Sequence, residues 1–199
     1  MHDLVHDLAE DVSGDNELVS LKASELEDVS EVRRLRLELD KEISATSLKS
    51  LSIAKKLQLR HLSFKQKHLR YLHLCCLDLS EVNYDQSISK LYNLETLVLT
   101  KMDIRVQNLL QNIQSLKKLR HLEVSFTYME ELPDSVTSLS NLQTLDLNNC
   151  ELKALPESAT GLKNLKLLDI SFNPIEELPA FIINLHNSCQ LLNHPLKLF

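Results

Sequence analysis

The sequence is dominated by a regular spacing of leucine. A unit of the form Leu-x-x-Leu-x-Leu recurs at steps of 25, 25, 23 and 23 residues, with Val or Ile in the last position of two copies. Periods of this length are typical of chains that build the same supersecondary unit repeatedly and stack the copies. The units begin at Leu69, Leu94, Leu119, Leu142 and Leu165.

Each unit predicts one coil of a stack. The Leu-x-Leu part alternates with a period of two, which predicts a short strand with its leucines inward and its other residues outward. A Leu-Pro pair follows in later copies, at Leu132-Pro133 and Leu155-Pro156, and the fixed φ of proline suits the first turn of a short helix or 3-10 segment. This pattern is that of a leucine-rich repeat. It predicts an α/β solenoid with a curved parallel sheet on its concave face and short helices or 3-10 turns on its convex face.

One position between each strand and its return path bears on the stacking. In leucine-rich repeats an Asn, Thr or Cys there bonds the backbone of the bend, so that stacked copies form a ladder. Only the last three copies here follow that rule, and we expect the first two coils to be looser. The five residues at this position are Leu77, Met102, Thr127, Cys150 and Asn173.

The pattern is weaker toward both ends. Residues 32–37 and 48–53 carry degraded units, which predict two or three irregular coils upstream. Downstream, the next leucine of the register should fall at position 188, where the chain has Ser188. We therefore expect regular repeats over about 69–187 and an abrupt end. The apolar tail either covers the open end or marks a truncation, and truncation is the favoured alternative.

Composition excludes several classes of function. The net charge is −6, and residues 1–30 hold nine acids against one base, Lys22. No part is basic enough to bind nucleic acid, and no apolar run approaches the roughly 18 residues that a membrane helix needs. The acidic start does not resemble a secretory signal. These features predict a cytoplasmic protein that contacts neither nucleic acid nor membrane.

The N-terminal segment carries the most specific motif. Residues 1–12 predict an amphipathic helix, with Leu4, Val5 and Leu8 on its apolar side. The run Met1-His2-Asp3-Leu4-Val5-His6-Asp7-Leu8-Ala9 resembles the Met-His-Asp motif of plant nucleotide-binding leucine-rich-repeat disease resistance proteins, near the end of their nucleotide-binding module. The resemblance implies a remnant of that module with an acidic linker over 1–30 and a leucine-rich-repeat domain over 31–199.

The same resemblance implies roles for two residues. His2 would sense the β-phosphate of bound ADP, and Asp3 would support it. Gly14 and Gly161 are too isolated to form a phosphate loop, so ADP or ATP would bind only where an upstream module is present. We expect no cofactor on this chain alone. The implied partners are proteins, either a pathogen effector or the receptor's own nucleotide-binding module.

The outward side chains of the strands form the candidate site. Glu123, Asp146 and Asp169 occupy the central outward position of successive strands, about 4.8 Å apart. Stacked carboxylates repel, and a basic partner would relieve the repulsion, although a merely solvated face is an equal alternative. The candidate protein-binding residues on the concave face are Tyr71, His73, His121, Glu123, Phe126, Thr144, Asp146, Asn148, Asp169 and Phe172.

Phe126 and Phe172 allow two interpretations. Large aromatic residues are over-represented among interface hot spots, so both can anchor a partner. In many repeats, however, an aromatic residue at this position packs down as part of a core spine. Composition does not decide between these interpretations.

No catalytic constellation is predicted. His2 and His6 stand four apart as in zinc protease helices, but Asp3 replaces the usual Glu and no third ligand is apparent. Cys75, Cys76 and His121 would place a thiol on a strand without the activation that a nucleophile needs. The cysteines also lack the spacing of a disulfide framework or zinc knuckle, so we expect reduced thiols, no metal and no enzyme.

The sequence thus predicts a plant-defence-type protein-binding module that recognises a ligand and restrains a nucleotide switch. The alternative is a free-standing cytosolic scaffold that resembles the Ras-group leucine-rich-repeat proteins, which assemble GTPases or phosphatases. The regular 23-residue Leu-Pro coils favour this alternative. The Met1–Ala9 run favours the receptor.

Overall fold

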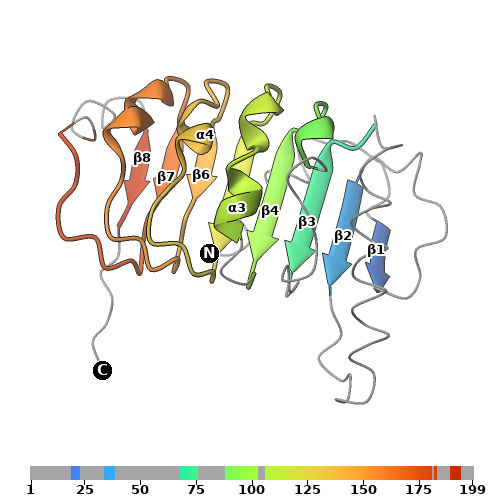
Figure 1. The fold of residues 1–199 in the computed structure, drawn as a ribbon, viewed down its shortest axis with the longest axis horizontal. Coiled ribbons are helices and arrows are strands. Elements are labelled where there is room, and N and C mark those ends of the chain that lie inside the picture. The colour runs from blue at the N-terminus through green and yellow to red at the C-terminus, as the bar shows by residue number, and fades with distance from the viewer. Residues whose placement is uncertain are drawn as a thin grey trace, which may run out of the picture.

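A single parallel sheet organises the computed structural model. The structure describes residues 19–22, 34–38, 68–75, 88–102, 106–180, 182 and 189–193. Its eight strands lie side by side in chain order, and all run in the same direction (Figure 1). They are β1 (Val19–Lys22), β2 (Arg34–Glu38), β3 (Tyr71–Cys75), β4 (Thr96–Thr100), β5 (His121–Ser125), β6 (Thr144–Asp146), β7 (Leu167–Asp169) and β8 (Gln190–Leu192).

The pairing register confirms the predicted repeat. Leu72 lies opposite Leu97, which lies opposite Leu122, and the row continues through Leu145 to Leu168. Because each strand pairs without a shift, equivalent leucines form straight rows and point to the same face. The five strands β3 to β7 all fall on the predicted Leu-x-Leu segments.

Short helical segments cover the other face of the coils. Pro133 and Pro156 each stand at the N-cap, immediately before a helical segment, with extended backbone at φ −64° and −72°. The sequence had predicted that these prolines lie in the first helical turn, which in fact begins one residue later. The predicted short helical segments after the strands are present. The segments are η2 (Ile88–Lys90), α3 (Val106–Leu110), η3 (Ile113–Ser115), α4 (Asp134–Thr137) and η4 (Glu157–Gly161).

The hydrophobic core fills the space between the sheet and these helical segments. One cluster runs without interruption from Leu69 to Cys189 and contains the inward leucines of every coil from β3 onward. Met102, for which a looser coil was expected, is buried in it. A continuous core is what stacked coils require, since a single coil cannot cover its own apolar face.

Two of the three polar bend positions, Cys150 and Asn173, make the predicted bonds to backbone, and Thr127 Oγ1 lies 3.4 Å from the Cys150 sulfur. The Asn173 Oδ1 atom accepts the N–H groups of Cys150 and Leu152 at 2.9 and 3.0 Å, and its Nδ2 donates to the carbonyl of Leu147 at 2.7 Å. The Cys150 thiol donates to the carbonyl of Val124 at 2.7 Å. Each side chain therefore satisfies backbone groups of the preceding coil, which fixes the stacking distance.

The sheet extends beyond the regular repeats at both ends. β8 pairs with β7, so that Leu168 lies opposite Leu191, and the expectation of an abrupt end near 187 is wrong: another strand follows even though Ser188 breaks the leucine pattern. Upstream, β2 carries the degraded unit and pairs with β3 directly. The second degraded unit, 48–53, lies outside the described residues. Val19–Lys22, inside the segment expected to be a linker, forms β1.

The described part of the chain contains no helix that is long and apolar enough to cross a membrane.

Candidate functional site

The outward side chains of the sheet line up as predicted. The register places Glu123 opposite Val98 on one side and Asp146 on the other, and Asp146 opposite Asp169. Beside this row, the His121 Nδ1 atom lies 3.1 Å from the Thr144 hydroxyl oxygen. The parallel sheet thus brings together residues that are 23 or 25 positions apart in the chain.

Most of these outward residues are nevertheless buried. Glu123 retains only 5% of its surface. Asp146 and Asn148 are half-buried. The remaining buried members of the predicted set are Tyr71, His73, His121, Thr144 and Asp169.

The three carboxylates are engaged within their own coils. Ser125 Oγ donates to Glu123 Oε1 at 2.7 Å. The N–H of Asn148 donates to Asp146 Oδ1 at 2.9 Å. Asp169 Oδ1 accepts the N–H of Ser171 in the same way, at 2.8 Å. These bonds turn the carboxylates toward the strand ends, which lessens the mutual repulsion that their alignment alone implies.

Burial shifts the pKa of Glu123 in this row and of His121 beside it. It raises the pKa of the Glu123 carboxyl above its ordinary value, and the Ser125 hydrogen bond opposes this rise. Burial also lowers the pKa of His121, and the Arg120 guanidinium lowers it further. Both shifts favour the neutral forms of the side chains, because a charge on either would lose solvation.

Phe126 and Phe172 differ from the rest of the predicted set. Each keeps 37% of its surface exposed, and neither belongs to the hydrophobic core. Each has a left-handed backbone, with φ of 53° and 60°. Lys101 and Asn149 occupy the equivalent positions of the neighbouring coils with the same conformation. Asparagine tolerates this conformation, whereas for phenylalanine it costs on the order of 1 kcal/mol.

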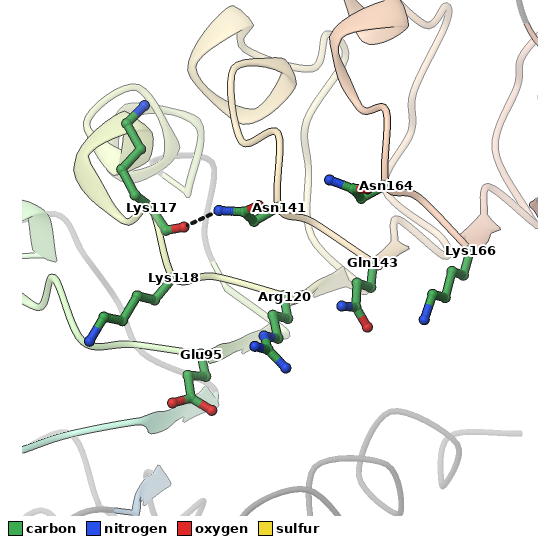
Figure 2. Close-up of a pocket in the computed structure, with 8 residues that line it drawn as sticks. All are labelled: Glu95, Lys117, Lys118, Arg120, Asn141, Gln143, Asn164 and Lys166. Atoms are coloured by element: carbon green, nitrogen blue, oxygen red, sulfur yellow. Dashed lines mark hydrogen bonds between the residues drawn. The ribbon is translucent and has the colours of Figure 1, made fainter.

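The sequence analysis missed a basic surface at the edge where the strands begin. A hollow of about 480 Å³ there is lined by eight residues, of which Glu95 is the one carboxylate (Figure 2). We call its four cationic residues the basic edge. The sequence does carry a sign of this surface, because two of these four cations directly precede a predicted strand. The candidate residues had been sought only within the strands and after them. The basic edge consists of Lys117, Lys118, Arg120 and Lys166.

Burial raises the pKa of two of the described thiols, Cys150 and Cys189, and so disfavours their reactive thiolate forms. Burial raises the pKa of the Cys150 thiol to about 12, so it stays protonated at neutral pH. Cys75, Cys150 and Cys189 form no disulfide. No group of three or more metal-ligating side chains occurs in the part of the chain that the structure describes. His2 and His6, which were considered and rejected as a zinc pair, lie outside the described residues, as do Asp3 and Cys76.

Comparison with known proteins agrees with this geometry. Residues 99–196 match the family model described as a leucine-rich repeat region. The fold is a leucine-rich-repeat solenoid. A leucine-rich-repeat domain of this kind is generally a non-enzymatic, protein-binding scaffold. No curated protein matches the sequence significantly.

Several solved structures share the fold. Human 5T4 (Wnt-activated inhibitory factor 1) is 20% identical, with a TM-score of 0.56 over 90% of this chain and 61% of its own. A Leptospira interrogans leucine-rich-repeat protein is 24% identical, with a TM-score of 0.51 over 81% of this chain and 44% of its own. The ectodomain of the receptor kinase SOBIR1 from Arabidopsis thaliana is 19% identical, with a TM-score of 0.50 over 77% and 94%. The chain therefore spans less than half the length of the Leptospira protein. At these identities the likeness concerns the fold alone.

Proposed function

We propose that this leucine-rich-repeat chain is the recognition portion of a plant intracellular immune receptor of the nucleotide-binding type. In this role it works in the cytoplasm, binds a protein on its concave face and helps to restrain an attached nucleotide switch. The Met1–Ala9 run supports the assignment, because nine consecutive residues match the motif that precedes the repeats in that family. The proposed partners are a pathogen effector or the receptor's own nucleotide-binding module.

The observation that carries protein binding is the pair of exposed phenylalanines. Phe126 and Phe172 lie at the same position of two coils that are separated by one other coil, so their side chains stand roughly 10 Å apart along the rim of the concave face. Exposed aromatic side chains on a rigid backbone lose little entropy on binding, which makes them effective anchors. The polar residues of the row between them would then contribute specificity.

Nucleotide sensing is part of the proposal only for the complete receptor. His2 and Asp3 would contact the β-phosphate of ADP held by a phosphate loop that belongs to the upstream module. We expect no measurable ADP binding by this chain alone, and titration calorimetry that detects micromolar binding would contradict this assignment.

The first experiment extends the reading frame upstream of Met1. A frame that continues into a phosphate loop supports the receptor assignment. A stop codon directly upstream overturns it and favours the second candidate, a free-standing scaffold of the Ras-group type. The regular 23-residue Leu-Pro coils support this second candidate.

The second experiment tests the phenylalanines. The upstream module, expressed as a separate chain, is captured on beads that carry this protein. We expect Phe126→Ala with Phe172→Ala to weaken capture by about tenfold or more, as loss of two hot-spot aromatics does. The matched control is Tyr92→Ala with Leu178→Ala, which removes two comparably exposed side chains away from this rim. Equal capture by both double variants would show that the phenylalanines are not the binding site.

A further inference from the structure

The basic edge is built on a rigid backbone ladder. The N–H of Arg120 donates to the carbonyl of Glu95 at 2.8 Å, and the N–H of Gln143 donates to the carbonyl of Arg120 at 2.7 Å. Lys166 continues the ladder with a 2.8 Å bond to Gln143. These bonds hold successive side chains at about the 4.8 Å spacing of the strands. Figure 2 shows the Arg120, Gln143 and Lys166 side chains projecting in the same direction from three neighbouring coils.

The turn before β5 adds two further cations. The Lys118 Nζ atom donates to Asn93 Oδ1 at 2.7 Å, which ties the side chain to the preceding coil. The carbonyl of Lys117 accepts the Asn141 Nδ2 group at 2.8 Å, which fixes the turn itself against the following coil (Figure 2). Hydrogen bonds between coils therefore fix the Lys118 side chain and the backbone of Lys117.

Two cations elsewhere on the described surface, Arg70 and Lys153, have a carboxylate partner. Arg70 lies 3.8 Å from Glu95, and Lys153 lies 2.6 Å from Glu130. Four cations that share a hollow with a single carboxylate, Glu95, raise the local positive potential, which favours an anionic ligand. Among the described residues, no carboxylate lies within ion-pairing distance of Lys117, Lys118, Arg120 or Lys166.

The charge balance differs between the two edges of the sheet. Five carboxylates follow the strands at the opposite edge, where Lys101 and Lys153 also lie. This difference occurs in a chain whose net charge is −6, so the basic edge is not the average surface of a basic protein. The carboxylates of the opposite edge are Glu130, Glu131, Glu151, Glu176 and Glu177.

The shape of the edge favours a polypeptide over a small ligand. Six of the eight residues that line the hollow are exposed, whereas small-molecule sites enclose most of the ligand and are largely apolar. We propose that the basic edge docks an acidic polypeptide segment of a partner protein, in which Asp or Glu side chains recur along an extended chain. This surface is separate from the concave face and does not depend on the receptor assignment.

The test measures binding of a fluorescein-labelled decaglutamate peptide to the full chain by fluorescence anisotropy at low ionic strength. We expect Arg120→Gln with Lys166→Gln to weaken binding about fivefold, because each exposed ion pair contributes modestly. Lys101→Gln with Lys153→Gln changes the net charge equally at other sites, and we expect an effect of less than about twofold. Thermal melts followed by circular dichroism check that both variants are folded.

Three results would overturn the proposal. The first is no binding of decaglutamate to the unmodified chain. The second is an equal loss of binding affinity in both double variants, which would show that the effect depends only on net charge. The third is tighter binding of inorganic polyphosphate than of the peptide with the same dependence on Arg120 and Lys166, which would assign the edge to phosphate-rich ligands instead.

Discussion

Asn173 shows how one side chain determines the path of an adjacent coil. Its amide accepts two N–H groups of the preceding bend and donates to carbonyls of both coils, so nearly all of its hydrogen-bonding capacity is used. Cys150 performs part of this function with a single thiol. Because an unsatisfied buried backbone group is costly, the choice of residue at this position governs how well the coils stack.

The buried position of Glu123 disfavours a negative charge on its carboxyl group. Its pKa is raised by burial from an ordinary value of 4.5. For a carboxyl of this kind the stabilising contribution is present below the unfolded-state pKa and is lost as the pH rises through the folded-state pKa. We therefore expect Glu123→Gln to raise the melting temperature at neutral pH and to have little stabilising effect near pH 4.

Thermal melts of Glu123→Gln between pH 4 and 8, compared with the unmodified chain, measure this difference. His121 has a lowered pKa and adds an opposite slope on the acid side, but it is common to both proteins and cancels in the comparison. The control is Glu131→Gln at an exposed position. A Glu123→Gln gain that does not depend on pH would contradict the burial argument.

At the scale of elements, the return segments of neighbouring coils contact each other directly. α4 and η4 each begin after a proline, and the Thr137 hydroxyl of α4 donates to Ser158 Oγ of η4 at 3.1 Å. Gly161 ends η4 directly against α4: a Cβ added there would stand 2.7 Å from the backbone carbonyl oxygen of Thr137. Because this neighbour is a backbone atom, it cannot move away by a change of rotamer.

We expect Gly161→Ala to destabilise the protein by about 1–3 kcal/mol, the usual cost of overpacking. Chemical denaturation followed by circular dichroism measures this change. Thr160→Ala is the matched control, since Thr160 is exposed in the same 3-10 segment. A neutral Gly161→Ala would mean that α4 and η4 are not held at the distance seen here.

At the scale of the whole molecule, stability depends on contact between neighbouring coils. Leu122 is fully buried in β5, between Leu97 and Leu145 of the adjacent strands. We expect Leu122→Ala to cost about 2–5 kcal/mol, because the cavity would open at the centre of a continuous core. Leu178→Ala, at a position that is 40% exposed, should cost about 0.5 kcal/mol or less. Urea denaturation compares the two, and similar losses would argue against the stacked core.

The repeat itself was predictable because its cause is local. A period-two leucine pair makes a strand and a Leu-Pro pair makes a turn into a helical segment, so β3 to β7 followed from composition and spacing within each coil. β8 did not follow, because its register is supplied by pairing with β7. The unpaired backbone edge of β7 pairs with Gln190–Leu192, although Ser188 replaces the first leucine of the repeat unit.

The candidate site was predicted in part. Its alignment followed from the period, and Phe126 and Phe172 remained open between core and surface until their exposure was known. The burial of Glu123 and the hydrogen bonds that turn the three carboxylates had no signature along the chain. The basic edge was predictable in principle, since Arg120 and Lys166 each directly precede a strand. Its excess of four cations over one carboxylate, Glu95, becomes visible only when the coils are stacked.

Spacing along the chain was sufficient to establish a leucine-rich-repeat solenoid, its strands and its inward leucines, because each of these depends on residues within one coil. The assembled coils decided which outward side chains meet solvent, which charges are neutralised and where the sheet stops. These properties depend on neighbours that are 20 or more positions away in sequence, and only stacking brings those neighbours within contact distance.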